Sequence, residues 1–183
     1  MSVEEVAVAL VVLIVVSGSV VFGLRLSAAS MNALRERVTT TNATMRALAT
    51  RFGLRFSEPA PYRHPMIGDV LTYATASGSY RGRAVRIGVE SDEDTRQIVV
   101  TIGADASRPW PDLGRLKPGG AHPHLAPALA ALQPRASEIR VTPTALRVVP
   151  VESKHSSSEE DELAALVDAA LALAEALDEQ IGA

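Results

Sequence analysis

Cysteine is absent from the 183-residue chain, and aromatic residues make up only 4% of it. Without cysteine the chain has no disulfide framework, no thiolate zinc site and no cysteine nucleophile. The sequence also lacks a G-x-S-x-G elbow, a P-loop and a G-x-G-x-x-G fingerprint. Lysine is scarce as well, since Lys117 and Lys154 are the only two among the 18 lysine and arginine residues. These absences exclude several classes of enzyme and predict no bound cofactor.

Charge is absent from residues 6–24, which read VAVALVVLIVVSGSVVFGL. Thirteen of these nineteen residues are Val, Leu, Ile or Phe. A helix of this length spans roughly 28 Å, which is close to the thickness of the hydrocarbon core of a bilayer. The sequence therefore predicts a transmembrane helix over Val6–Leu24, preceded by a short tail of residues 1–5 outside the cytoplasm.

The flanks of this apolar segment indicate its processing and orientation. A cleaved secretory signal normally begins with positive charge, whereas this chain begins with MSVEE, so we expect a retained anchor. Arg25, Arg35 and Arg37 follow the segment, and the positive-inside rule then places the C-terminal domain in the cytoplasm, at a bacterial inner membrane. Ser19 and Gly23 form a small-xxx-small pair, which either packs two such helices together or reflects how common small residues are in spans.

The next segment, residues 25–53, is basic and has the apolar spacing of a helix. Its positions at a and d of three heptads are Met31, Leu34, Val38, Thr41, Met45, Leu48 and Phe52. The β-branched run Val38–Thr41 favours a break there, after which Asn42 would cap a second short helix that Gly53 ends. Two alternatives stay open: a coiled-coil stalk that self-associates, or a helix that folds back on its own domain or lies on the membrane surface.

A proline-rich linker is predicted over residues 54–67, and a folded domain over residues 68–183. Two half-buried strands are predicted on either side of a polar loop from Asp92 to Thr95. One register puts their apolar residues on one face by pairing Val89 with Ile98, Ile87 with Val100 and Val85 with Ile102. A further strand over about Val70–Tyr80 folds against Arg83–Glu90 through a two-residue turn at Arg81-Gly82.

The second half of the domain begins with a proline- and glycine-rich loop at residues 108–127, and a short helix is predicted over Leu125–Leu132. A second hairpin is expected over Ile139–Val151. Ser157 and Glu160 form a capping box at the start of a C-terminal helix with an apolar stripe. The predicted fold class is therefore α+β, with a small antiparallel sheet of two hairpins or a meander that the C-terminal helix covers.

Candidate binding residues are the arginines of the first hairpin and its neighbour, Arg81, Arg83, Arg86 and Arg96. Such a basic edge would bind phosphate, anionic headgroups or an acidic partner. Charged residues at a sheet edge also serve simply to prevent aggregation. Nucleic acid is not an expected partner, because the chain has few aromatic residues and only a small excess of positive charge over residues 52–151.

The pair His122 and His124 has a spacing that suits metal binding. The alternative is that these are exposed loop histidines, because Pro123 separates them and the loop lacks the cysteine or glutamate partners of known metal motifs. A membrane-tethered enzyme or metal-binding domain that uses both histidines is therefore the alternative function.

The hairpin pattern G-x-Y-x-G-R-x-V, formed by Gly78, Tyr80, Gly82, Arg83 and Val85, resembles uncharacterised single-span membrane-anchored proteins of GC-rich bacteria. The resemblance covers about residues 68–180 and implies the α+β class without implying an activity. A Gly-Asp-x-x-Phe-Asp segment of that family is missing here.

The sequence as a whole favours a membrane-anchored interaction or scaffold protein without catalysis. Its expected partners are the lipid bilayer and either another protein or a second copy of the chain. The acidic C-terminal segment, in which residues 152–183 contain nine acidic residues and one lysine, adds to the charge asymmetry that such a role would use.

Overall fold

The computed structural model describes residues 30–60, 62–64, 68–70, 72–92, 95–117, 122–151 and 159–182. The chain divides into two units, Met1–Thr40 and Thr41–Ala183. Residues 30–52 are helical, so the described part of the first unit is the beginning of a helix. The second unit contains the sheet and the remaining helices.

No helix within the described residues combines the length and the apolar character needed to cross a membrane. The helix at residues 30–52, for example, includes Arg35, Glu36 and Arg37, and charged residues are unfavourable in the hydrocarbon core. This finding contradicts the predicted localisation as a single-pass membrane protein with a cytoplasmic domain. The predicted span Val6–Leu24, with Ser19 and Gly23, lies outside the described residues.

The helix at residues 30–52 continues without a break through Val38–Thr41 and Asn42. The prediction of a second helix capped by Asn42 is therefore wrong. The predicted end of the helix at Gly53 is confirmed, because Gly53 has φ of +63° and the Leu54 N–H donates to the Ala49 carbonyl at 2.8 Å. This is the Schellman motif, in which a glycine with positive φ ends the helix.

The helix is continuous because Asn42 is bonded to the rest of the domain and not to its own helix. Asn42 is 8% exposed, and its side-chain amide donates to the Thr72 carbonyl at 3.0 Å and to Glu58 at 3.1 Å. Its side-chain oxygen accepts the Ala74 N–H at 2.7 Å. These bonds outweigh the modest helix penalty of the β-branched run, which is several tenths of a kcal/mol per residue.

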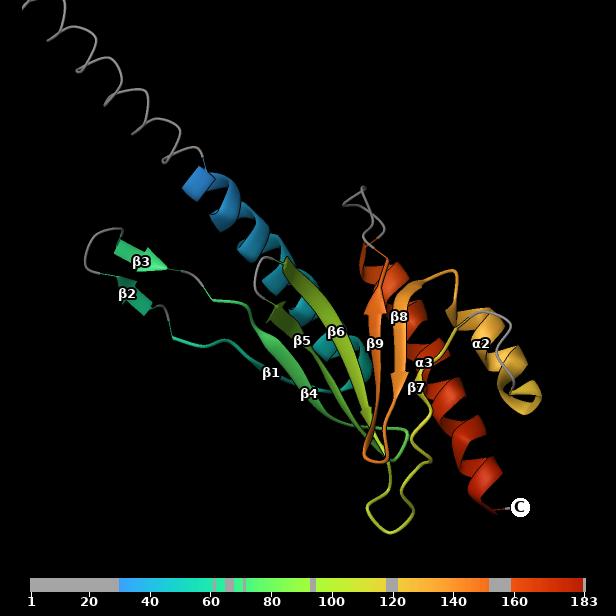
Figure 1. Cartoon of the computed structure of the whole chain (residues 1–183). Helices are drawn as coiled ribbons and strands as arrows, with labels where there is room; N and C mark the ends of the chain where they lie inside the picture. The colour runs from blue at the N-terminus through green and yellow to red at the C-terminus, as the bar shows by residue number, and fades with distance from the viewer. Residues whose placement is uncertain are drawn as a thin grey trace, which may run out of the picture. The chain divides into compact units, whose positions relative to one another are not determined.

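Seven strands form one antiparallel sheet in the order β1-β4-β5-β6-β9-β8-β7 (Figure 1). Each pair of neighbours is antiparallel, as the α+β prediction required. The strands are β1 (Arg55–Ser57), β4 (Thr75–Tyr80), β5 (Arg83–Asp92), β6 (Thr95–Gly103), β7 (Gly114–Arg115), β8 (Ala136–Val141) and β9 (Ala145–Pro150).

The predicted register between β5 and β6 is confirmed at Val89–Ile98, Ile87–Val100 and Val85–Ile102. The predicted turn between β4 and β5 is confirmed too, since Arg81 has φ of 51° and Gly82 has φ of 76°. Two successive positive φ angles are the signature of a type I′ turn, which matches the twist of a hairpin. The second predicted hairpin corresponds to β8 and β9.

Three features of the sheet differ from the sequence prediction. The segment predicted as a linker contains β1 at one edge of the large sheet, and also β2 (Tyr62–His64), which pairs with β3 (Gly68–Val70) in a separate two-stranded sheet. The predicted loop at residues 108–127 contains β7 at the other edge. Strands of two or three residues carry almost no alternation, so a sequence pattern cannot indicate them.

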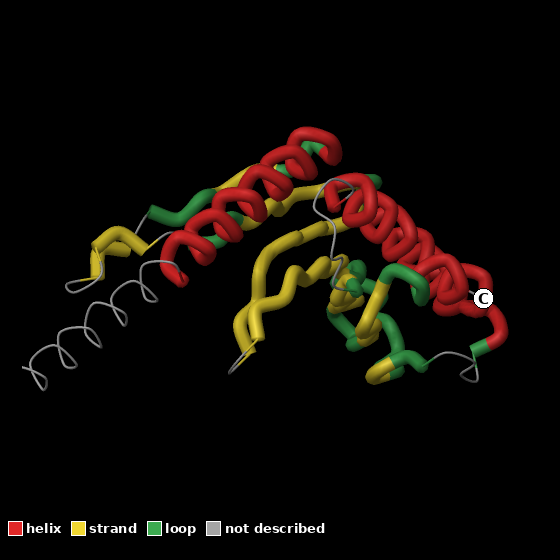
Figure 2. Tube along the Cα trace, turned by 90° about the horizontal axis from the view of Figure 1, so that it is seen from above, coloured by secondary structure: helices red, strands yellow, loops and turns green. Residues whose placement is uncertain are grey.

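Helices cover one face of the large sheet (Figure 2). The core there combines α3 (Glu159–Gly182) with residues from Met45 to Phe52 of the N-terminal helix, and with Leu125, Leu129 and Leu132 from η1 (Pro123–Leu125) and α2 (Ala126–Leu132). The predicted stripe of α3 is buried from Leu163 to Leu177, whereas Ile181 is 38% exposed. Residues 45–52 thus pack on their own domain, as one of the two alternatives expected, although the sequence placed the start of the folded unit at residue 68.

Candidate functional site on the open face of the sheet

The four arginines predicted as one basic edge do not lie together. Arg81 forms an ion pair with Asp168 of α3 at 3.3 Å. Arg83 is bonded to Asp178 of the same helix and lies 5.7 Å from the centre of the Trp110 ring. These two arginines therefore hold α3 against the β4–β5 hairpin.

The remaining two candidates lie apart from each other as well. Arg96 stacks over the ring of Tyr73, 5.9 Å from its centre. Arg86 alternates with the buried Val85 and Ile87 along β5, so its side chain is on the face of the sheet that the helices do not cover. We call this uncovered face the open face, and Arg86 belongs to a larger group of arginines on it.

A row of residues that includes five arginines crosses all seven strands of the sheet. Successive register pairs join Arg55 to Ser77, Ser77 to Arg86, Arg86 to Thr101, Thr101 to Arg147, Arg147 to Arg140 and Arg140 to Arg115. Residues directly opposite each other in an antiparallel pair lie on the same face. We call these seven residues the arginine row: Arg55, Ser77, Arg86, Thr101, Arg147, Arg140 and Arg115.

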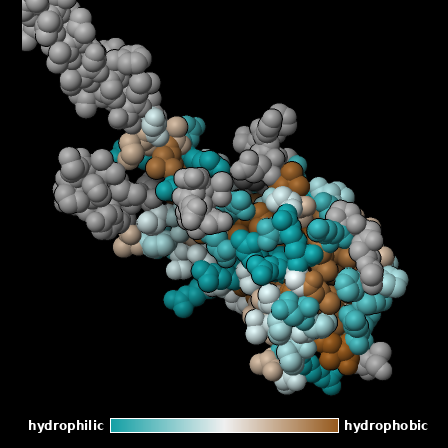
Figure 3. Space-filling view, viewed as in Figure 1, coloured by the Kyte–Doolittle hydropathy of each residue, from teal (hydrophilic) through white to brown (hydrophobic). Residues whose placement is uncertain are grey.

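The arginine row is accessible along its length. Its members Arg55, Arg86, Arg140 and Arg115 are exposed, and Arg147 is half-buried. With neighbouring strands about 4.8 Å apart, the row extends over roughly 29 Å. Hydrophilic residues gather over the strands on this side of the molecule (Figure 3). The open face is therefore a long positively charged surface and not an isolated cation.

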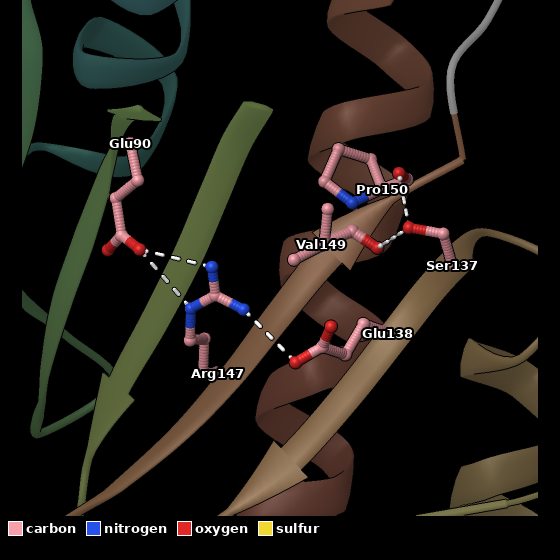
Figure 4. Close-up of polar contacts among 6 residues, drawn as sticks. All are labelled: Glu90, Ser137, Glu138, Arg147, Val149 and Pro150. Atoms are coloured by element: carbon pink, nitrogen blue, oxygen red, sulfur yellow. Dashed lines mark hydrogen bonds and ion pairs between the residues drawn. The ribbon is translucent and has the colours of Figure 1, made fainter. Parts of the chain in front are cut away.

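Arg147 has acidic partners on both sides. Its Nε and Nη2 donate to one oxygen of Glu90 at 3.3 and 3.1 Å, and its Nη1 donates to Glu138 at 3.2 Å. Glu90 comes from β5 and Glu138 from β8. The guanidinium of Arg147 therefore links the two strands that flank the β6–β9 pair (Figure 4). Only 32% of the Arg147 side chain is exposed, which strengthens these charge-assisted bonds.

The other four arginines of the row have no ion pair to any described residue. Five arginines against Glu90 and Glu138 leave a local excess of three positive charges. The whole chain has a net charge of −3, so this surface has the opposite sign to the chain average. Such a separation of charge favours an anionic partner at this face.

Small side chains lie directly beside the arginine row. Ala84 pairs with Ser79, and Gly103 pairs with Ala145 on the same face. A Cβ added at Gly103 would lie 3.2 Å from the Cβ of Ala84, so the two strands are closely packed at this point. A partner can approach the backbone closely here.

On the other side of the row, Val99 and Val149 are only 2% and 3% exposed although they face outward. A hollow of about 10 Å³ lies between Arg86, Gly88, Glu90, Val99 and Thr101. That volume holds about one water molecule and not an organic substrate. The open face is therefore suited to contact with a surface or a chain.

The two predicted metal ligands lie elsewhere. His122 precedes η1 and His124 is inside it, with 6.2 Å between their ring centroids. Among the described residues, no group of three or more His, Asp or Glu side chains is placed to hold a metal ion. A metal site built on His122 and His124 stays a prediction.

Sequence reasoning identified only Arg86 of the five arginines in the row. The signal for Arg140 and Arg147 was present, because both alternate with the apolar residues of the second predicted hairpin. The pairing of β6 with β9 joins that hairpin to the first, and nothing local in the sequence indicates it. Arg55 and Arg115 are in edge strands that the sequence did not predict.

Comparison with protein-family models, with curated proteins and with solved structures finds no match for this chain. The resemblance to membrane-anchored proteins of GC-rich bacteria stays a prediction. The function is therefore argued from the geometry of the open face.

Proposed function

We propose that the chain is a non-catalytic interaction protein, whose unit Thr41–Ala183 binds an anionic macromolecule on the open face of its sheet. The observation that carries the proposal is the arginine row, which is continuous across seven strands and opposite in sign to the chain as a whole. Arginine suits this use, because its planar guanidinium remains charged and binds carboxylate or phosphate through two parallel hydrogen bonds.

The shape of the face supports binding and not catalysis. The hollow beside Arg86 is about 10 Å³, too small for a substrate. Catalytic groups normally converge in a concave site that buries most of a ligand. The row offers instead an exposed strip of side-chain donors, one residue from each strand, which suits an extended partner.

Cation-exchange chromatography of the full-length chain at pH 7 tests the proposal. A protein of net charge −3 binds a sulfonate resin only through a local positive surface. The double variant R86Q/R140Q should elute at lower salt than wild type. The charge-matched control R35Q/R37Q changes two exposed arginines of the N-terminal helix.

Equal elution of R86Q/R140Q and R35Q/R37Q would contradict the proposal. Two arginines of the row would then contribute no more to binding of the resin than two arginines elsewhere in the chain. Circular dichroism of each variant shows whether the fold is retained. We expect it to be, since substitutions of exposed residues usually change stability by about 0.5 kcal/mol or less.

A further inference from the structure

We infer that the occupant of the open face is an acidic protein segment, in which carboxylate side chains bind the arginine row. This inference rests on the proposed function and names the chemical class of its partner. The alternatives that share the same charge are a single-stranded nucleic acid and a second copy of the chain. Three observations favour the acidic protein segment.

The first observation is the absence of aromatic residues from the row and from the residues paired beside it. Sites for single-stranded nucleic acid combine basic side chains with aromatic rings on which bases stack. Here the positions between and beside the arginines are small or aliphatic: Ser77, Ser79, Ala84, Val99, Thr101, Gly103, Ala145 and Val149. This face can bind charge but offers no platform for a base.

The second observation is the pair of carboxylates in the middle of the face. Glu90 and Glu138 lie on either side of Arg147 and hydrogen bond to it. A phosphate backbone carries one negative charge at every nucleotide and would meet repulsion there. A protein segment can place its carboxylates opposite Arg86 and Arg140, and neutral or positive groups opposite Glu90 and Glu138.

The third observation is the length of the row together with the small residues beside it. Roughly 29 Å corresponds to about nine residues of extended chain. The small residues Ala84, Gly103 and Ala145 beside the row let a peptide backbone lie close to the sheet. The hydroxyls of Ser77 and Thr101 lie between the arginines and can bond to backbone groups of that peptide.

Fluorescence anisotropy with two defined probes tests the inference on the full-length chain. One probe is a labelled twelve-residue peptide with glutamate at every fourth position and serine elsewhere, which matches the three-strand separation of Arg86 and Arg140, and a peptide with glutamine in place of glutamate is its control. The other probe is a labelled twelve-residue oligodeoxythymidine. We expect the glutamate peptide to bind more tightly than the oligonucleotide, and the glutamine peptide not to bind.

Three variants locate the binding. R86Q/R140Q should weaken binding of the glutamate peptide at least about tenfold, because each of its two substitutions removes hydrogen bonds to a carboxylate of the peptide. R35Q/R37Q should leave it unchanged. E90Q should strengthen it, since the change removes repulsion and frees Arg147 for the peptide, and an increase in affinity cannot arise from misfolding.

The possible outcomes separate the inference from the function on which it rests. If the oligonucleotide binds more tightly and loses binding in R86Q/R140Q, the open face is a binding surface but its partner class is wrong. If wild type self-associates at low salt and R86Q/R140Q does not, the occupant is a second copy and the inference is overturned. If R86Q/R140Q binds both probes as wild type does, or neither probe binds, the inference and the proposed function both fail.

Discussion

Asn42 connects the N-terminal helix to the strands through three hydrogen bonds. Its side-chain NH₂ group donates to the Thr72 carbonyl and the Glu58 carboxylate, and its oxygen accepts the Ala74 N–H, at distances from 2.7 to 3.1 Å. A buried donor or acceptor that loses its partner costs about 1–3 kcal/mol. Asn42 therefore stabilises the domain from the middle of a helix, where asparagine has no local advantage.

The variant Asn42→Ala should lower the free energy of unfolding by about 1–3 kcal/mol, because the Ala74 N–H and the Thr72 carbonyl lose their partner while alanine regains only a few tenths of a kcal/mol of helix propensity. Urea denaturation followed by circular dichroism measures the change. Asn32→Ala, at an exposed position of the same helix, is the control and should change stability by about 0.5 kcal/mol or less. Equal stability of the two variants would show that the Asn42 bonds are not maintained in solution.

At the scale of elements, the β4–β5 hairpin depends on the conformation of Arg81 and Gly82. An added Cβ at Gly82 would meet no atom within 4 Å, so space does not prevent a side chain there. The φ of 76° nevertheless requires the left-handed region, which is unfavourable for residues other than glycine.

Gly82→Ala should therefore destabilise the domain by about 1–2 kcal/mol through backbone strain alone. Thermal unfolding of the variant measures this against Gly88→Ala, where a Cβ would meet only ordinary contacts with Thr75 at 3.5 Å and beyond. A larger loss from Gly88→Ala than from Gly82→Ala would mean that the turn does not have the conformation described.

Asp178 links α3 to two other parts of the domain. One of its oxygens accepts the Trp110 indole N–H at 2.7 Å, and the other is bonded to Arg83. Trp110 is only 2% exposed, and the Asp178 carboxylate is the acceptor of its N–H. Arg83, which the sequence predicted as a ligand-binding residue, thus positions α3.

Asp178→Ala should lower the free energy of unfolding by about 1–3 kcal/mol, because it leaves a buried indole N–H without an acceptor. Asp161→Ala is a matched control in the same helix and should have a smaller effect, since the Asp161 side chain is 85% exposed and solvent screens its ion pair with Arg51. Chemical denaturation monitored by Trp110 fluorescence distinguishes them. Equal effects of the two variants would contradict the structural role of Asp178.

The fold was predictable where apolar residues alternate over six or more positions. The register of Val85, Ile87 and Val89 with β6 and the stripe of α3 follow from such patterns. The edges β1 and β7 were not predictable, because strands of two or three residues carry no periodicity. Asn42 was interpreted as a cap because its partners at Glu58, Thr72 and Ala74 are distant in the sequence.

At the scale of the whole molecule, the candidate site arises from the order of strands. Arg55 and Arg147 are 92 positions apart in the sequence, yet they belong to one row because β4, β5, β6 and β9 are neighbours. The sequence prediction grouped Arg81, Arg83, Arg86 and Arg96 by proximity along the chain. Tertiary packing instead pairs Arg81 and Arg83 with α3 and places Arg96 over Tyr73, while long-range strand pairing brings Arg86 together with Arg140 and Arg147.

The two faces of the sheet therefore have different roles. The inner face is apolar and covered by α3 and by residues from Met45 onward, which stabilises the fold. The outer face carries the arginine row, whose charges contribute little to stability at exposed positions. Residues that are exposed, positively charged and dispensable for folding are available for a partner.

The central claim is that the arginine row is a binding surface, and an NMR titration of the arginine Nε–Hε resonances tests it most directly. Addition of the glutamate and serine peptide should shift the resonances of Arg86, Arg140 and Arg55, with smaller shifts for Arg81 and Arg83, whose acidic partners lie on α3. Shifts confined to arginines outside the row, or no shift at all at millimolar peptide, would contradict the claim.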